Sequence, residues 1–306
     1  MGMIPSAFAQ STVDREGEAG QAWLSELPTI IEDVLASWDC TLDGPLGHGQ
    51  VGVIAPVRRS GGPAVLKVSF PHPGNVHEPD AFAAWDGRGA VHLYERDDDR
   101  FAMLLERAQP STLTELGDGD EIATLAGRLS RRLSIPASAG LPRLADQADS
   151  WDEELRKDAA EFAGALPVAV VDSARAVIDE LGRDQPDLVV HGDFHPRNIL
   201  RADREPWLAV DPKGYVGDPA YDGATLLKPR ALALMESEDV MKALLHELDV
   251  FSDAAELEPE RVRRWAHLQV VQAAFHGRRR GFGRARGGPL LDRMLALVDH
   301  WAISWC

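Results

Sequence analysis

One polar stretch, His191–Asp211, contains the residues best suited to chemistry. Asp193 follows a short apolar run, and Asn198 comes five positions later. Two β-prone segments joined by a polar turn come after Asn198, and a hairpin of that size returns the chain to its starting point, so Asp211 should lie beside Asn198. An acid that can accept a proton, together with an amide and a second acid that can hold a divalent cation, is the set that phosphoryl transfer requires.

A glycine-rich segment lies nearer the N-terminus. Gly47, Gly49 and Gly52 form a GxGxxGxV pattern that continues as a strand and not as a helix, which argues against a dinucleotide fingerprint. Alone, the pattern also fits a flexible hairpin turn. Lys67 lies within the next apolar run, where an ammonium is costly to desolvate unless it meets an anion. Together these residues predict a loop that covers phosphates and a lysine that binds the α- and β-phosphates, with a solvated edge-strand lysine as the alternative.

Two further nucleotide contacts are assigned by position. An acid should pair with Lys67, and Glu78 is the nearest candidate, although a residue before proline is biased away from helix and Glu78 would then be only an N-terminal cap. The polar stretch that contains Glu106 and Ala108 lies where a linker between lobes is expected. Its backbone groups would pair with the adenine edge.

Strand patterns dominate the first third of the chain and helical patterns the rest. Before the first strand, an amphipathic helix is expected at residues 21–37, with Pro28 splitting it. The predicted strands are residues 42–57, 63–70, 90–96 and 100–106, and the predicted helices are residues 78–85, 120–133, 152–166, 169–181, 239–249, 259–275 and 289–305. This order predicts an α+β protein with a loose leader (1–20), a sheet-rich nucleotide-binding lobe (21–106) and a helical lobe with the catalytic loop and acceptor site (107–306).

The net charge of −17 makes nucleic acid an unsuitable partner and would attract a cationic small molecule, although such a charge also serves solubility. The only two cysteines match no metal-binding spacing and fit a reducing compartment. No apolar run approaches the roughly 18 residues of a membrane span. We therefore expect a cytoplasmic protein, monomeric or dimeric, that acts on a small molecule and binds neither nucleic acid nor membrane.

The glycine loop, Lys67, the motif HGDFHPRN (residues 191–198) and Asp211 together resemble the protein-kinase-like fold, and most closely the aminoglycoside phosphotransferase superfamily. Four further segments look like the group of streptomycin 6-phosphotransferases and hydroxyurea phosphotransferases: GQAWLSELP (20–28), LLER (104–107), REPWLAVDPK (204–213) and VGDPAYD (216–222). The resemblance runs from roughly residue 20 to residue 275. It implies two lobes, a β-rich N-lobe and a mainly helical C-lobe.

The resemblance also implies roles for individual residues. Asp193 would accept or orient the proton of an acceptor hydroxyl, and Asn198 and Asp211 would hold the Mg²⁺ of Mg·ATP. His191 and His195 would brace the loop. Their spacing invites a zinc site, but the glycine and proline between them argue against a helical ligand pair.

The C-terminal part matches the group less well. Asp218 and Asp222 would cap or brace the segment after Asp211, direct substrate contact being the less favoured interpretation. Five arginines fall within Arg278–Arg286, where the resemblance leads us to expect carboxylates. A solvated basic loop is the favoured interpretation, and the alternative is a pocket wall that repels streptomycin and suits a neutral or anionic acceptor.

The function we expect is ATP- and Mg²⁺-dependent transfer of a phosphoryl group to a hydroxyl of a small molecule, as in antibiotic-resistance kinases of the aminoglycoside (streptomycin)/hydroxyurea type. A metabolic kinase for an amino alcohol, sugar or nucleoside is one alternative. A catalytically silent nucleotide-binding regulator is another, although the complete set of Lys67, Asp193, Asn198 and Asp211 argues against it. The sequence leaves open the acceptor and its hydroxyl, the choice between ATP and GTP, and the oligomeric state.

Overall fold

The computed structural model describes residues 4–137, 139–226, 239–282 and 287–305. The chain forms two compact units, one of Met1–Ser111 and Leu200–Lys213, the other of Thr112–Ile199 and Gly214–Cys306. We had expected the hairpin after Asn198 to belong with the helical part. In the structure it belongs to the first unit, because the Ala209 N–H donates to Gly89 O at 2.8 Å and the Ala209 carbonyl accepts from Val91 N at 3.2 Å.

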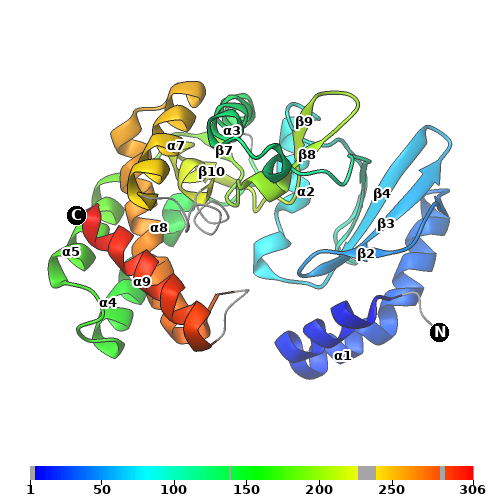
Figure 1. Ribbon diagram of the computed structural model, residues 1–306. Helices are drawn as coiled ribbons and strands as arrows, with labels where there is room; N and C mark the ends of the chain where they lie inside the picture. Colours follow the sequence, from blue (N-terminus) through cyan, green and yellow to red (C-terminus); the bar gives the residue numbers. More distant parts are fainter. Residues whose placement is uncertain (1–3, 138, 227–238, 283–286, 306) are drawn as a thin grey trace. The chain divides into compact units, whose positions relative to one another are not determined.

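The first unit is built on one antiparallel sheet with the strand order β1-β3-β4-β6-β5. Strand β2 pairs with β3 along the same edge as β1. Figure 1 labels β2, β3 and β4 of this sheet. The strands are β1 (Thr41–Leu42), β2 (Gly47–His48), β3 (Gly52–Arg59), β4 (Gly62–Ser69), β5 (Leu93–Asp97) and β6 (Ala102–Glu106). Two more strands, β8 (Ile199–Arg201) and β9 (Trp207–Ala209), form the hairpin that we predicted. The long strand expected at residues 42–57 is thus three strands, because the glycine-rich turn reverses the chain within it.

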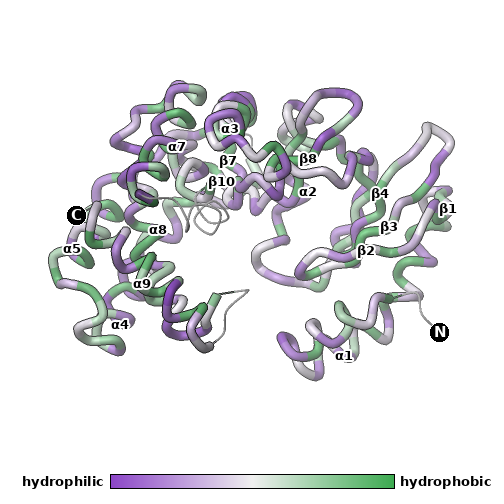
Figure 2. Tube along the Cα trace, in the orientation of Figure 1, coloured by the Kyte–Doolittle hydropathy of each residue, from purple (hydrophilic) through white to green (hydrophobic). Residues whose placement is uncertain are grey.

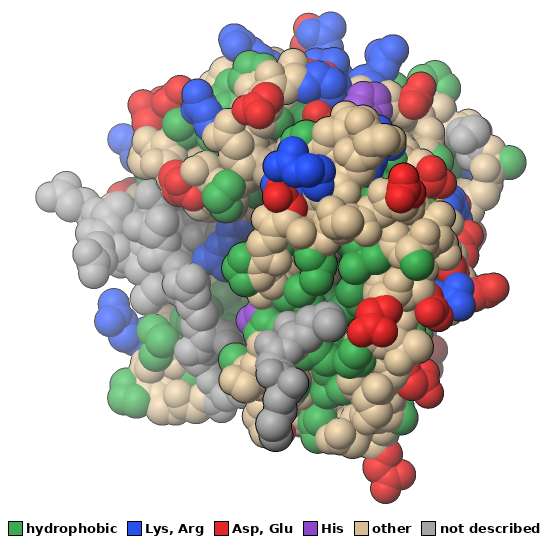
Figure 3. Space-filling view, turned by 90° about the vertical axis from the view of Figure 1, so that its right-hand side faces the viewer, with side chains coloured by type: hydrophobic (Ala, Val, Ile, Leu, Met, Phe, Trp, Pro, Cys, Tyr) green, Lys and Arg blue, Asp and Glu red, His purple; other side chains and the backbone are tan. Residues whose placement is uncertain are grey.

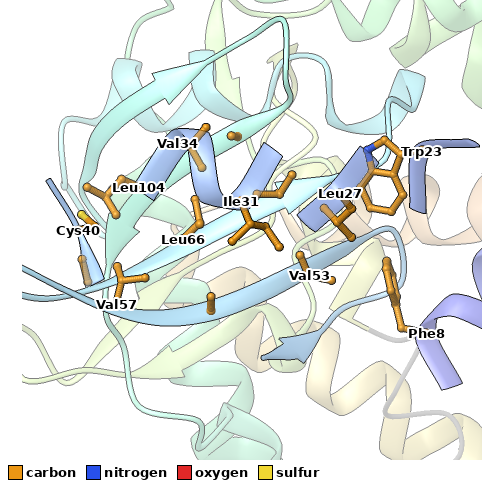
Figure 4. Packing of buried hydrophobic residues seen from close by; sticks show 14 of the residues in the cluster. Phe8, Trp23, Leu27, Ile31, Val34, Cys40, Val53, Val57, Leu66 and Leu104 are labelled. Carbon is orange, nitrogen blue, oxygen red and sulfur yellow. The ribbon is translucent and has the colours of Figure 1, made fainter. Parts of the chain in front are cut away.

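The two faces of this sheet carry different residues. Alternation along β3 and β4 places Val53, Leu66 and Val68 on the face that packs against helix α1 (Ser6–Ser37), in an apolar core shown in Figure 4. Figure 2 shows hydrophobic residues along the same two strands. The opposite face carries Lys67, and helix α2 (Glu78–Trp85) supplies its partner there. The sheet therefore separates a structural face from a polar one.

Helix α1 differs from the prediction at two points. It begins at Ser6, so residues 6–20 are helical where we expected a loose leader, and Phe8 is fully buried. The helix is interrupted at Gly17, where φ is 61° and ψ is −134°, a conformation that glycine adopts at no steric cost, and Pro28 lies inside the helix. A Cβ on Gly20 would lie 2.8 Å from the Thr12 carbonyl oxygen, so the two parts of α1 touch closely at this kink.

The second unit is mainly helical. Its helices are α3 (Gly119–Leu133), α4 (Ala148–Glu161), α5 (Val168–Val177) with a π-helical extension (Ile178–Gly182), α7 (Val240–Ala255), α8 (Pro259–Arg280) and α9 (Gly288–Ser304), and residues 220–226 are also helical. Helix α8 packs against α4, α5, α7 and α9, and α3 packs against α7. A two-stranded antiparallel sheet, β7 (Leu188–Val190) and β10 (Tyr215–Gly217), leads into and out of the catalytic motif. The expected order of a β-sheet region followed by a helical region is confirmed.

Short caps explain where several of these helices begin. The Asp118 carboxylate accepts the N–H groups of Asp120 and Glu121 at the start of α3, and Glu258 does the same ahead of α8. None of the described helices is both long and apolar enough to span a bilayer. Acidic side chains are scattered over the face shown in Figure 3, as the net charge of −17 requires.

Candidate active site

In the first unit, Lys67 joins two carboxylates that are far apart in the sequence. Its Nζ lies 2.6 Å from Glu78 Oε1, 2.8 Å from Glu78 Oε2 and 2.7 Å from Asp211 Oδ1. Strand β4 turns Lys67 away from the α1 core, and Glu78 occupies the first turn of α2, after the N-cap residue His77. The pairing of Glu78 with Lys67 that we proposed from position is what the structure shows, and the capping position falls to His77.

The charges of this cluster follow from its burial. Glu78 is 1% exposed, and burial raises its pKa to about 7 even though Lys67 acts in the opposite direction. Burial alone would lower the pKa of Lys67, but the charges of Asp211 and Glu78 outweigh it and hold the pKa above its ordinary value. Lys67 is therefore an ammonium shared by two acids. Asp211 is the more accessible of these, with 42% of its side chain exposed.

The glycine-rich loop connects β2 to β3. Its turn is closed by a hydrogen bond from Gly49 N to Gly52 O at 2.9 Å. A Cβ on Gly52 would lie 2.7 Å from both Ser69 Oγ and the Val68 carbonyl oxygen, so the protein's own packing requires glycine there. A Cβ on Gly49 would meet no atom within 4 Å. The two glycines thus differ, since only Gly49 borders open space.

The segment expected to meet adenine begins at the end of β6. The Glu106 N–H donates to His92 O at 2.8 Å, and its carboxylate accepts from His92 N at 3.0 Å and from Arg204 Nη2 at 2.9 Å. The side chain of Glu106 therefore ties the β8–β9 hairpin to the sheet. An adenine contact at Glu106 and Ala108 stays a prediction.

In the second unit, the motif after β7 forms a compact loop around Asp193. The amide of Asn198 donates from Nδ2 to the Asp193 carbonyl oxygen at 3.0 Å, and His195 N donates to the same oxygen at 3.0 Å. The Asp193 N–H approaches His191 Nδ1 at 3.3 Å, and the carboxylate lies 3.8 Å from His195 Nε2. Both histidines thus contact the backbone or the acid of this loop, as bracing residues do. A quarter of the Asp193 side chain is exposed.

A buried acid anchors this loop from a distant segment. The Asp222 carboxylate accepts the N–H groups of His191 and Gly192, each at 2.8 Å, and is 3% exposed. Burial raises the pKa of Asp222 to about 7, against the opposing effect of these two hydrogen bonds. Because Gly192 has a φ of 81°, the loop needs glycine where it turns toward this anchor.

Asp218 fixes the other end of the same segment. Its Oδ2 accepts from Arg261 Nε and from Trp265 Nε1, each at 2.6 Å, and its N–H donates to Gln185 Oε1 at 2.9 Å. Asp218 and Asp222 therefore brace the chain after Asp211, which was the favoured expectation. Sequence reasoning missed Gln185, Arg261 and Trp265, because nothing in their spacing links them to the motif.

An aromatic cluster that we did not predict forms around Tyr221, which lies between these two acids in the sequence. The Tyr221 ring stacks on Trp151, with centroids 6.0 Å apart and planes at 7°, and Trp265 meets Tyr221 edge-on at 5.3 Å. Burial raises the pKa of Tyr221 above its usual range, and Tyr215 and the charges of Asp222 and Asp193 act in the same direction. Tyr221 thus lies within electrostatic reach of Asp193.

The arginines that departed from the family pattern are placed differently from the expected loop. Arg278–Arg280 are the last turn of α8, and Arg284 and Arg286 fall outside the described residues. Arg278 makes a bidentate ion pair with Asp299 of α9, at 2.8 and 2.6 Å. Arg279 pairs with Asp158 of α4. These two arginines therefore join helices. Their position is also favourable because a helix dipole stabilises positive charge near the helix C-terminus.

Comparison with solved structures identifies the fold. The fold matches choline kinase LicA from Streptococcus pneumoniae with a TM-score of 0.56 at 15% identity, covering 91% of this chain and 99% of that one. It also matches aminoglycoside phosphotransferase APH(4)-Ia, in a ternary complex with ADP and hygromycin B, with a TM-score of 0.52 at 14% identity, covering 90% and 96% of the two chains. The fold is therefore the protein-kinase-like α+β fold of these small-molecule kinases.

Sequence comparison then gives the family. Residues 37–281 match the aminoglycoside/hydroxyurea antibiotic resistance kinase family, and the chain belongs to it. Streptomycin 6-kinase of Streptomyces glaucescens is 34% identical over 89% of this chain and 90% of its own. Hydroxyurea phosphotransferase of Kitasatospora aureofaciens is 31% identical over 88% and 78%. The protein is thus a phosphotransferase that acts on small molecules, and the comparisons favour neither the metabolic kinase nor the silent regulator.

Proposed function

We propose that this protein phosphorylates a hydroxyl of a streptomycin-type aminoglycoside, with Mg·ATP as the donor. The observation that carries the proposal is the contact of the buried Lys67 with both Glu78 and Asp211. A lysine held by an acid of α2, beside a more exposed acid, is the arrangement with which kinases bind phosphates and a metal. An alternative use as a structural ion pair would not require an exposed carboxylate.

The nucleotide would meet the polar face of the first unit. The loop of Gly47, Gly49 and Gly52 would let the backbone approach and cover the phosphates, and Lys67 would bind the α- and β-phosphates with Glu78 keeping it in place. The adenine would pair with the backbone near Glu106 and Ala108.

Asn198 and Asp211 are the metal ligands in this proposal. Both offer oxygen atoms, which Mg²⁺ prefers, and the Asn198 amide donates through Nδ2 to Asp193 O, so its oxygen is the atom left for a cation. Mg²⁺ would neutralise negative charge that develops on the transferring phosphoryl group.

The reaction itself needs one proton acceptor. The acceptor hydroxyl oxygen forms a bond to the γ-phosphorus while the bond from that phosphorus to the β–γ bridging oxygen breaks, and ADP leaves with that oxygen. The hydroxyl proton passes to the Asp193 carboxylate. Because the transition state is loose, placing the hydroxyl in line matters more than the basicity of Asp193.

Two observations support a cationic acceptor. The relatives named streptomycin 6-kinase, from Streptomyces glaucescens and Streptomyces griseus, are 34% and 32% identical to this chain. In addition, a quarter of the Asp193 side chain is exposed, and a carboxylate attracts guanidinium groups. Hydroxyurea is the second candidate acceptor, because a relative of that name matches at 31%. Such an enzyme would work in the cytoplasm, where ATP is available.

Replacing Asp193 tests the mechanism. Asp193→Ala should abolish acceptor-dependent ADP release and leave the Kd for ATP unchanged, because the nucleotide contacts are elsewhere. Asp187→Ala, just before β7, is the matched control, since Asp187 is exposed and pairs only with Arg143 among the contacts of the described residues. Turnover by Asp193→Ala at a rate near that of the parent would exclude the assigned role.

A further inference from the structure

The first part of helix α1, residues 6–16, contacts the glycine-rich loop, and we call it the N-terminal segment. It lies outside the match to the resistance kinase family, which begins at residue 37. Arg15 Nη1 donates to the Gln50 carbonyl oxygen at 2.9 Å, and the ring of Phe8 lies 5.4 Å from that of His48. His48 and Gln50 flank Gly49 on its two sides, so both sides of the turn are held.

The N-terminal segment is fixed in place by packing. Phe8 is fully buried and meets Trp23 edge-on, with centroids 6.1 Å apart, as Figure 4 shows for both rings. Trp23 in turn meets Phe70 edge-on at 5.6 Å. The Phe70 N–H donates to the Val51 carbonyl oxygen at 2.7 Å, on the far side of the turn. The series of aromatic contacts from Phe8 through Trp23 to Phe70 therefore ends at the same loop.

The bond from Arg15 determines which way one peptide of the loop faces. In a trans peptide the C=O and the next N–H point in opposite directions. Because the Gln50 carbonyl points to the guanidinium of Arg15, the N–H of Val51 points away from the N-terminal segment. Without Arg15 this carbonyl would be free to turn, and a carbonyl facing a phosphate repels it. Arg15 thus favours the peptide orientation that offers a donor to an anion.

We propose that the N-terminal segment is a positioning element for the glycine-rich loop, with Arg15 and Phe8 as positioning residues that set the affinity for the nucleotide phosphates. The inference rests on the proposed role of the loop in nucleotide binding. It predicts that these residues influence ATP binding and leave acceptor binding unaffected, since the contacts described for both lie within the first unit.

Arg15→Met is the principal variant, because it keeps the aliphatic stem and removes the donor, and a third of the side chain is exposed. Phe8→Leu keeps the position apolar and removes the ring contact with His48. Arg100→Met is the matched control: Arg100 also links α1 to the sheet, through Asp33 at 3.6 Å, but at the β5–β6 turn. For each variant we would measure the Kd for ATP by calorimetry, KM for ATP and for the acceptor, kcat, and the melting temperature.

We expect Arg15→Met to raise the Kd and KM for ATP by about five-fold, the loss of one hydrogen bond, with acceptor KM unchanged and with Arg100→Met close to the parent. Phe8→Leu should shift ATP affinity in the same direction. An unchanged Kd in both Arg15→Met and Phe8→Leu, even with a lower melting temperature, would overturn the proposal, as would an equal change in Arg100→Met. Failure of the parent protein to bind ATP would instead refute the nucleotide role of the loop.

Discussion

The substitution Asp222→Asn tests how a buried acid affects the stability of the second unit and the geometry of its catalytic loop. The carboxylate of Asp222 accepts two backbone N–H groups, those of His191 and Gly192, at 2.8 Å each. An asparagine offers one oxygen and sets an NH₂ group against the second N–H. The change therefore leaves one backbone donor unsatisfied two residues or fewer from Asp193, at a cost of about 1–3 kcal/mol.

The pH dependence of this cost follows from the pKa of Asp222, which burial raises from 3.8 to about 7. Because the folded pKa lies above the unfolded one, the stability that protonated Asp222 supplies is fully present below pH 3.8 and is lost as the pH rises through about 7. The difference between these two pKa values corresponds to about 4 kcal/mol in the free energy of unfolding, and most of this stability is lost between pH 5 and pH 8. Asparagine does not titrate, so the stability deficit of Asp222→Asn should be visible at pH 5 and should close or reverse at pH 8.

The assay is urea unfolding at both pH values together with steady-state kinetics at pH 8. We expect kcat to fall about ten- to a hundred-fold, since the loop that places Asp193 loses an anchor, while KM for ATP stays within about three-fold. Asp218→Asn is the matched control, because Asp218 bonds Arg261 and Trp265 and does not touch the loop. A pH-independent deficit in Asp222→Asn, or an equal loss of kcat in Asp218→Asn, would refute the reasoning.

Three other changes have definite expected outcomes. Gly52→Ala should lower the free energy of unfolding by about 1–3 kcal/mol, because a Cβ there would lie 2.7 Å from atoms of β4. Gly49→Ala should leave stability unchanged and raise KM for ATP. Equal melting temperatures of the two variants would contradict this expectation. Burial lowers the pKa of His267 below 6.5, so the stability it supplies is present above pH 6.5 and lost as the pH falls through its folded pKa; His267→Gln should flatten that part of the stability profile in urea titrations. Replacing Arg278–Arg280 with alanine should lower the melting temperature, because the ion pairs with Asp299, Asp158 and Glu161 are lost, and should leave acceptor KM unchanged. A changed KM would restore the pocket-wall interpretation.

The chemistry-bearing residues could be found from the sequence because they are local or follow strong patterns. Asp193 and Asn198 belong to one short loop, and the strand that presents Lys67 has a clear apolar pattern. Glu78 could be assigned from its position in the sequence, since α2 begins at this residue. The order of strands and then helices gave the fold class in the same way.

The parts that sequence reasoning missed depend on contacts between distant segments. Gln185, whose Oε1 accepts from Asp218 N, lies 33 residues before Asp218 in the chain, and Tyr221 stacks on Trp151, which comes from another helix. Propensity placed the break of α1 at Pro28, but burial of Leu27 and Ile31 on the sheet offsets the cost of a proline inside a helix. The kink falls instead at Gly17, where it allows Phe8 to join the core.

The central claim, phosphoryl transfer from Mg·ATP to an aminoglycoside hydroxyl, is tested most directly by coupled ADP release. The panel is streptomycin, other aminoglycosides, hydroxyurea and simple amino alcohols, with Asp193→Ala as the inactive control. We expect Mg²⁺-dependent ADP release with streptomycin that is absent in Asp193→Ala. Turnover of amino alcohols alone, with silence on streptomycin and hydroxyurea, would contradict it.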